Sequence, residues 1–86
     1  MQSASEIPPR RVTGFRADVK TDDEHVRLFA QVEEERWTAS VYNMTRRKWV
    51  LGGEWASDAA DAKRSAEHHA RYFIPGEYEI TWVEIH

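Results

Sequence analysis

The sequence predicts an α+β domain in which an antiparallel β-sheet, in the order β-β-β-β-α-β, carries one helix on one face. Three observations predict this fold class. Four segments alternate apolar and polar residues with the period of a strand, and short polar turns separate them. A later segment repeats alanine at helical spacing, and the chain ends in a further strand-like stretch. Successive strands joined by short turns favour an antiparallel meander.

The first two strands are expected over residues 13–20 and 25–33, where apolar side chains occupy alternate positions. The acidic segment 21–24 between them suits a turn. Strands with this pattern turn one face toward the helix and the other face away from it. The second face is expected to be mostly polar with some aromatic surface, and to carry Arg27, Phe29, Gln31, Thr38, Ser40 and Tyr42.

The next two strands are expected to form a hairpin. Residues 37–42 alternate in strand period, residues 43–47 are short and polar enough for the loop, and residues 48–51 fit the return strand. The pair Gly52-Gly53 ends or bulges this strand, because glycine adopts backbone angles that other residues avoid.

One helix is expected between an N-cap at Ser57 or Asp58 and the stop signal Pro75-Gly76. The small side chains of its apolar stripe let the helix lie close to the sheet, so the large side chains of the core must come from the strands. The stripe is formed by Ala59, Ala62, Ala66, Ala70 and Phe73.

The four tryptophans, Trp37, Trp49, Trp55 and Trp82, are expected to fill the core opposite the alanine stripe, because small helix residues need large partners. The alternative is that one or two of them are exposed contact residues, since tryptophan is favoured at interface hot spots.

A last strand is expected within residues 77–86, where Tyr78, Ile80 and Trp82 alternate with polar residues. The apolar phase slips between Trp82 and Val83. A bulge would explain the slip, and so would a strand buried on both faces, one of them by a partner chain.

Length and composition limit the organisation of the chain. Its 86 residues are expected to form a disordered tail over residues 1–9 and a single domain over residues 10–86. The sequence contains no cysteine, which excludes a disulfide framework and fits a reducing compartment. No apolar run has the length of a membrane span, so we expect a cytoplasmic protein that makes no membrane contact.

No catalytic or metal-binding pattern stands out in the sequence. Ser57 is explained as a helix cap, and the carboxylates of residues 22–24 and of Asp58 are explained by turns and caps. The run Glu67-His68-His69 does not converge on a metal, because neighbouring helical residues point about 100° apart whereas helical zinc sites use i,i+4 histidines. We therefore expect no catalytic residues, no metal and no small-molecule cofactor.

The preferred functional hypothesis is a non-enzymatic protein-interaction module. It would form a homodimer or bind another protein through the far face of the sheet or an edge strand. The negative net charge of −3 favours this class over nucleic-acid binding. The expected interaction surface is formed by Phe29, Tyr42, Trp82, Val83 and Ile85.

The alternative is a nucleic-acid-binding domain that uses the basic hairpin of residues 36–55, with a small enzyme as the remaining class. Residues 36–73 hold seven basic and four acidic side chains, +3, within an acidic protein. A two-stranded ribbon with a basic tip fits a DNA groove or contacts phosphates. The tip would equally serve as a solvated turn that prevents edge aggregation. A common face with Arg64 would favour nucleic acid. The expected contacts are Arg36, Tyr42, Arg46, Arg47 and Lys48.

Overall fold

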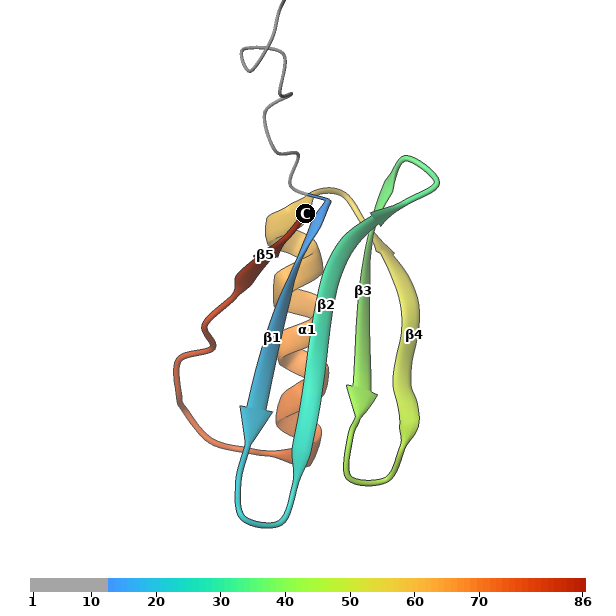
Figure 1. Cartoon of the computed structure of the whole chain (residues 1–86). Helices are drawn as coiled ribbons and strands as arrows, with labels where there is room; N and C mark the ends of the chain where they lie inside the picture. The colour runs from blue at the N-terminus through green and yellow to red at the C-terminus, as the bar shows by residue number, and fades with distance from the viewer. Residues whose placement is uncertain (1–12) are drawn as a thin grey trace, which may run out of the picture.

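The sheet contains five antiparallel strands, and one helix crosses a single face of it (Figure 1). This computed structural model describes residues 13–86. The tail expected over residues 1–9 and the domain start expected at residue 10 lie outside the described residues. The expected α+β fold is confirmed. Its elements are β1 (Gly14–Lys20), β2 (His25–Glu33), β3 (Arg36–Asn43), β4 (Lys48–Ala56), α1 (Ala59–Phe73) and β5 (Val83–Ile85).

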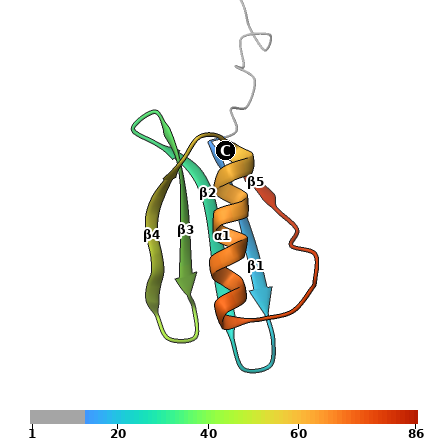
Figure 2. The ribbon, with the colours of Figure 1, turned by 180° about the vertical axis from the view of Figure 1, so that it is seen from behind.

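The strands lie in the order β4-β3-β2-β1-β5. Strands β1 to β4 form the expected meander, in which each strand pairs with the one before it. After α1 the chain passes outside β1 and returns, so that β5 pairs antiparallel with β1 (Figures 1 and 2). The helix contacts β2, β3 and β4 on one face of the sheet.

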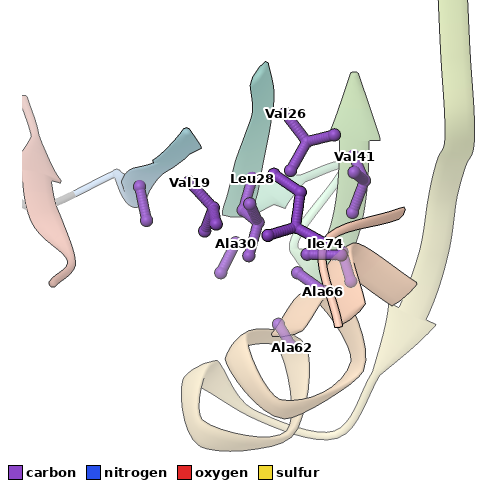
Figure 3. Close-up of a cluster of buried hydrophobic side chains, with 11 residues drawn as sticks. Val19, Val26, Leu28, Ala30, Val41, Ala62, Ala66 and Ile74 are labelled. Atoms are coloured by element: carbon purple, nitrogen blue, oxygen red, sulfur yellow. The ribbon is translucent and has the colours of Figure 1, made fainter. Parts of the chain in front are cut away.

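The helix and the sheet meet through small side chains on α1 and larger aliphatic side chains on the strands (Figure 3). Ala62 and Ala66 of α1 are fully buried, as are Leu28 of β2 and Val41 of β3. The alanines let the helix backbone approach the strands closely, as the alanine stripe predicts. Each fully buried aliphatic side chain contributes about 1.5–3 kcal/mol of burial free energy.

The helix begins at a cap that the sequence predicts. The Asp58 carboxylate accepts a hydrogen bond from the backbone N–H of Asp61 (2.8 Å), so Asp58 and not Ser57 is the N-cap. This bond satisfies one of the orphan N–H groups of the first turn. Beyond the other end, the Arg71 guanidinium donates to the carbonyl of Tyr78 (2.8 Å) and holds the following segment against the helix.

Strand β4 does not end at the glycine pair but continues to Ala56. Its register with β3 skips Val50 and Gly53, so both residues are bulges. Gly53 has a φ of +94°, a backbone conformation that glycine adopts without steric cost. Of the two expectations for Gly52-Gly53, the bulge is correct and the strand end is wrong.

The C-terminal strand is shorter than expected, because only Val83–Ile85 pairs with β1. The indole N–H of Trp82 donates to the Glu67 carboxylate of α1 (2.8 Å), so Trp82 lies on the helix side. Val83 pairs with Arg16 and points to the other side of the sheet. The apolar phase therefore slips because Trp82 faces the helix and Val83 faces the opposite side of the sheet. Val83 is 54 % exposed, and its burial by a partner chain stays a prediction.

Only two of the four tryptophans contribute to the core. Trp37 and Trp82 pack partly buried against it, whereas Trp49 is 57 % and Trp55 68 % exposed. The expectation that all four fill the core is wrong, and the alternative of exposed tryptophans is correct for these two. Leu28 and several valines and alanines fill the core instead.

The alanine stripe leads to a test of the helix packing. Replacing Ala66, which has no exposed surface, by Leu is expected to overpack the contact with the sheet and to cost about 1–3 kcal/mol of unfolding free energy. Ala60 lies on the exposed side of α1, so the same change there is expected to stay within about 0.5 kcal/mol. Thermal or urea unfolding measures both. An unchanged melting temperature for Ala66→Leu would show that the helix is docked differently.

Candidate functional site

No described element covers the face of the sheet opposite α1, and we call it the open face (Figures 1 and 2). Directly paired residues of an antiparallel sheet point to the same side, so the register defines its members. They are Arg16, Asp18, Lys20, His25, Arg27, Phe29, Gln31, Glu33, Arg36, Thr38, Ser40, Tyr42, Trp49, Gly52 and Trp55, with Val83 and Ile85 from β5.

Aromatic rings gather on the open face where β2, β3 and β4 lie side by side. The Trp49 ring packs edge-on against Tyr42, with 5.0 Å between the ring centroids. It is tilted against Phe29 at 6.0 Å. Phe29 and Tyr42 thus pack against the Trp49 ring, and more than half of the Trp49 surface stays exposed.

A second exposed ring lies further along β4. The guanidinium carbon of Arg36 is 4.0 Å from the centroid of the Trp55 ring, a cation–π contact. Trp49 pairs with Tyr42, and because of the two bulges Trp55 pairs with Thr38, so the tryptophans are about 13 Å apart along the sheet.

A groove lies beside Trp49, over β2, β3 and β4, with Gly52 in its floor. No atom lies within 4 Å of the position that a Cβ at Gly52 would take, so the space above this residue is open. The groove has a volume of about 330 Å³. Its lining residues are Gln31, Glu33, Ser40, Trp49, Gly52 and Gly53.

The open face is net basic although the whole chain has a net charge of −3. Within the described residues, no carboxylate forms an ion pair with Arg16, Lys20 or Arg36. The acidic side chains of this face are Asp18 and Glu33, against the basic side chains Arg16, Lys20, Arg27 and Arg36.

Asp18 is held by two neighbours on β2. Its carboxylate lies 2.8 Å from Nε of Arg27 and 2.7 Å from Nε2 of His25. Burial by itself would raise the pKa of Asp18, but the hydrogen bonds and charges of Arg27 and His25 outweigh it and keep the pKa of this carboxyl below its usual value. Asp18 therefore neutralises part of the positive charge at this end of the open face.

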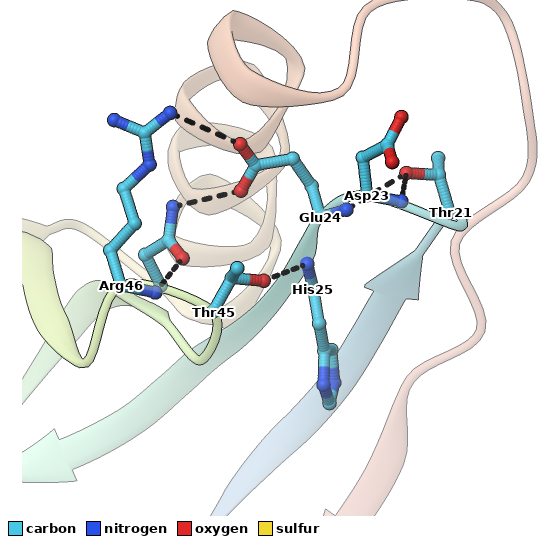
Figure 4. Close-up of polar contacts among 7 residues, drawn as sticks. Thr21, Asp23, Glu24, His25, Thr45 and Arg46 are labelled. Carbon is cyan, nitrogen blue, oxygen red and sulfur yellow. Dashed lines mark hydrogen bonds and ion pairs between the residues drawn. The ribbon is translucent and has the colours of Figure 1, made fainter.

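The basic hairpin tip lies beside the acidic β1–β2 turn, which neutralises Arg46 (Figure 4). The Arg46 guanidinium contacts the Glu24 carboxylate of the β1–β2 turn at 3.3 Å. The Thr45 hydroxyl accepts from the backbone N–H of His25 (2.9 Å), which fixes the tip beside that turn. The same turn also carries Asp22 and Asp23, whereas no carboxylate of residues 13–86 forms an ion pair with Arg47 or Lys48.

The expected nucleic-acid contacts do not form one patch. Arg36 and Tyr42 lie on the open face, whereas residues 46–48 form the tip, at the opposite end of β3 from Arg36. Arg64 is exposed on α1, on the other side of the sheet, so no common face joins it to Arg36. The structure thus separates Arg36 from the tip, and nucleic-acid contact by these residues stays a prediction.

The expected interaction surface also divides. Phe29, Tyr42, Val83 and Ile85 lie on the open face, but Trp82 contacts α1 on the opposite side. The sequence did not indicate Gly52 or Arg16 as members of this surface, and it left open which tryptophans are exposed. Alternation within residues 37–42 already predicts that Tyr42 faces away from the helix. The pair Tyr42–Trp49 lies next to the hairpin loop, before the first bulge, so the register of the hairpin could have placed Trp49 on this face.

A scan against protein-family models and searches of curated proteins and of solved structures found no match for this chain. In the part of the chain that the structure describes, no helix is long and apolar enough to cross a membrane. Residues 13–86 also bring no three metal-ligating side chains together. The arrangement of the open face is therefore the basis on which a function can be argued.

The ion pairs of Asp18 predict a pH-dependent stability. Because the folded pKa lies below the unfolded value of about 3.9, this carboxylate stabilises the fold above that value and loses its contribution as pH falls through the folded pKa. Asp18→Asn is expected to be less stable than wild type at pH 7, with a difference that shrinks below about pH 4. Urea unfolding at both pH values measures this, with Asp22→Asn as a control outside the ion pair. A difference that stays constant with pH would contradict it.

Proposed function

We propose that this protein is a non-enzymatic domain that binds single-stranded nucleic acid through its open face. One observation supports this function above the others: exposed aromatic rings and unpaired basic side chains share a sheet face that no described element covers. Sequence-tolerant binding of single strands combines these two components, base stacking on aromatic side chains and a positively charged path for the backbone.

Stacking is assigned to the tryptophans of β4. Trp49 and Trp55 are the two most exposed tryptophan side chains of the described residues, and both belong to the open face. A base can lie on such a ring only when its own face is free, which excludes a base inside a duplex. The proposed ligand is therefore single-stranded, not double-stranded.

Phosphate contacts are assigned to Arg16, Lys20 and Arg36, for which no ion pair exists among residues 13–86. The acidic net charge of the chain does not oppose this, because many of the carboxylates belong to the turns, to α1 or to the segments around it. The negative net charge of the whole chain was the reason to prefer a protein partner. The local positive charge of the open face therefore carries more weight than this net charge.

The proposal predicts salt-dependent binding that requires the tryptophans. A labelled single-stranded oligonucleotide of about 12 nucleotides should quench tryptophan fluorescence on binding, with an affinity that falls steeply as salt rises. Trp49→Ala and Trp55→Ala should each lose about 1–3 kcal/mol of binding free energy. A duplex of the same length should compete poorly.

A pair of matched double variants tests where the phosphates bind. Arg16→Ala with Arg36→Ala removes two charges from the open face, and Arg46→Ala with Arg47→Ala removes two charges from the tip. The first pair should weaken binding more and reduce the salt slope, since each lost phosphate contact lowers it by about one. Equal losses from both pairs would contradict an assignment of the phosphates to the open face alone, and loss from the tip alone would favour the hairpin.

Self-association through the same face is the second candidate. Val83 is 54 % exposed on β5 and lies, like Trp49 and Phe29, on the open face. Exposed aromatic side chains such as Trp49 are typical interface hot spots. This candidate predicts a homodimer at micromolar concentration, which mass measurement over a dilution series checks. A monomeric mass over a hundredfold dilution from near millimolar would exclude it.

We further propose a cytoplasmic location. Single-stranded nucleic acid is present there, and a chain without cysteine suits a reducing compartment. Fractionation of cells that produce the protein tests this, and recovery outside the cytoplasmic fraction would contradict it.

A further inference from the structure

The groove beside Trp49 contains polar groups that neither base stacking nor phosphate binding would require. Glu33 is an anion on a face proposed to bind a polyanion. One oxygen of its carboxylate accepts from the side-chain amide of Gln31 (3.3 Å). The other oxygen would lie 3.9 Å from a Cβ at Gly53, and the Ser40 hydroxyl would lie 4.0 Å from it. A carboxylate and a hydroxyl thus converge on one point of the groove.

The shape of the groove suits a flat ring. Its wall is the Trp49 ring, held in place by Tyr42 and Phe29. Its floor is the backbone of Gly52, above which no side chain stands. A planar group can therefore lie against Trp49 with its edge toward Glu33 and Ser40.

We propose that this groove binds a guanine base, stacked on Trp49 with its Watson–Crick edge toward Glu33. This inference rests on the proposed function, because it assigns one base position within the single-stranded ligand. Guanine presents two neighbouring donors on that edge, the N1–H and the N2 amino group, and an ionised carboxylate is an acceptor only. The Ser40 hydroxyl supplies a donor for the O6 carbonyl.

The other bases match Glu33 less well. Adenine and cytosine place a ring-nitrogen acceptor beside their amino group, and this acceptor would face the carboxylate. Thymine and uracil have one N–H between two carbonyl oxygens. A carboxylate also repels phosphate, so a base edge gives Glu33 a role that a backbone contact does not.

The experiment compares oligothymidines of equal length that carry one central guanosine, adenosine, cytidine or inosine. The guanosine strand should bind at least about fivefold tighter than the unsubstituted strand, the range that one bidentate base contact supplies. Inosine lacks the N2 amino group and should lose most of this gain. Adenosine and cytidine should show little of it.

Three variants locate the site. Glu33→Gln should abolish the guanosine preference without weakening binding of the unsubstituted oligothymidine. Glu34→Gln removes the same charge from the adjoining turn and should leave the preference intact. Gly52→Ala places a methyl group in open space, at a residue without a positive φ, and should reduce the guanosine gain while the fold is kept.

The possible outcomes distinguish failure of the guanine site from failure of the proposed single-strand binding. If all strands bind with Trp49-dependent affinity but guanosine gives no gain, or if Glu33→Gln keeps the gain, the guanine site is rejected and single-strand binding stands. If none of the oligonucleotides binds, both the proposed function and the guanine site are rejected.

Discussion

The structure depends on one packing constraint: a single helix, with a stripe of alanines, must cover a five-stranded sheet. Ala62, Ala66 and Ala70 are fully buried and bring α1 close to the strands. A helix is about 10 Å wide, whereas five strands spaced about 4.8 Å apart form a wider sheet. The helix therefore covers one face only, and the segment after it closes the β1 side of the same face with Tyr78, Ile80 and Trp82. The other face must be built from side chains that tolerate water, and any binding surface of the sheet is decided there.

The two bulges of β4 determine what that face presents. Val50 and Gly53 drop out of the register, so Gly52 pairs with Ser40 and turns to the side away from the helix. Without the bulges Trp49 would still pair with Tyr42, but Trp55 would pair with Arg36 instead of Thr38, and Gly52 would face α1. Gly53 makes the second bulge inexpensive because its φ of +94° suits glycine. A local irregularity of one strand thus places Gly52 in the groove beside Trp49.

The distribution of charge gives the open face its proposed ligand. Glu24 neutralises Arg46 of the hairpin tip, and Asp18 partly neutralises Arg27, while Arg16, Lys20 and Arg36 have no ion-pair partner among residues 13–86. An acidic protein can therefore present a basic surface. Glu33 is a carboxylate on this basic surface, and it would repel a phosphate. This repulsion supports a base edge as the partner of Glu33.

Strand alternation, turn chemistry, the Asp58 cap and the alanine stripe could all be predicted from the sequence, because each depends on residues within a few positions of one another. The helix-side orientation of Trp37 and the away-facing orientation of Phe29, Ser40 and Tyr42 followed from the same period. The pairing of β5 with β1, the contact between Arg46 and Glu24, and the exposure of Trp49 and Trp55 could not. These features join segments far apart in the chain, or depend on which face of the sheet the single helix leaves uncovered. The sequence by itself determined the elements and the inner face of the sheet, and only the tertiary structure decided which aromatic and basic side chains meet on the outer one.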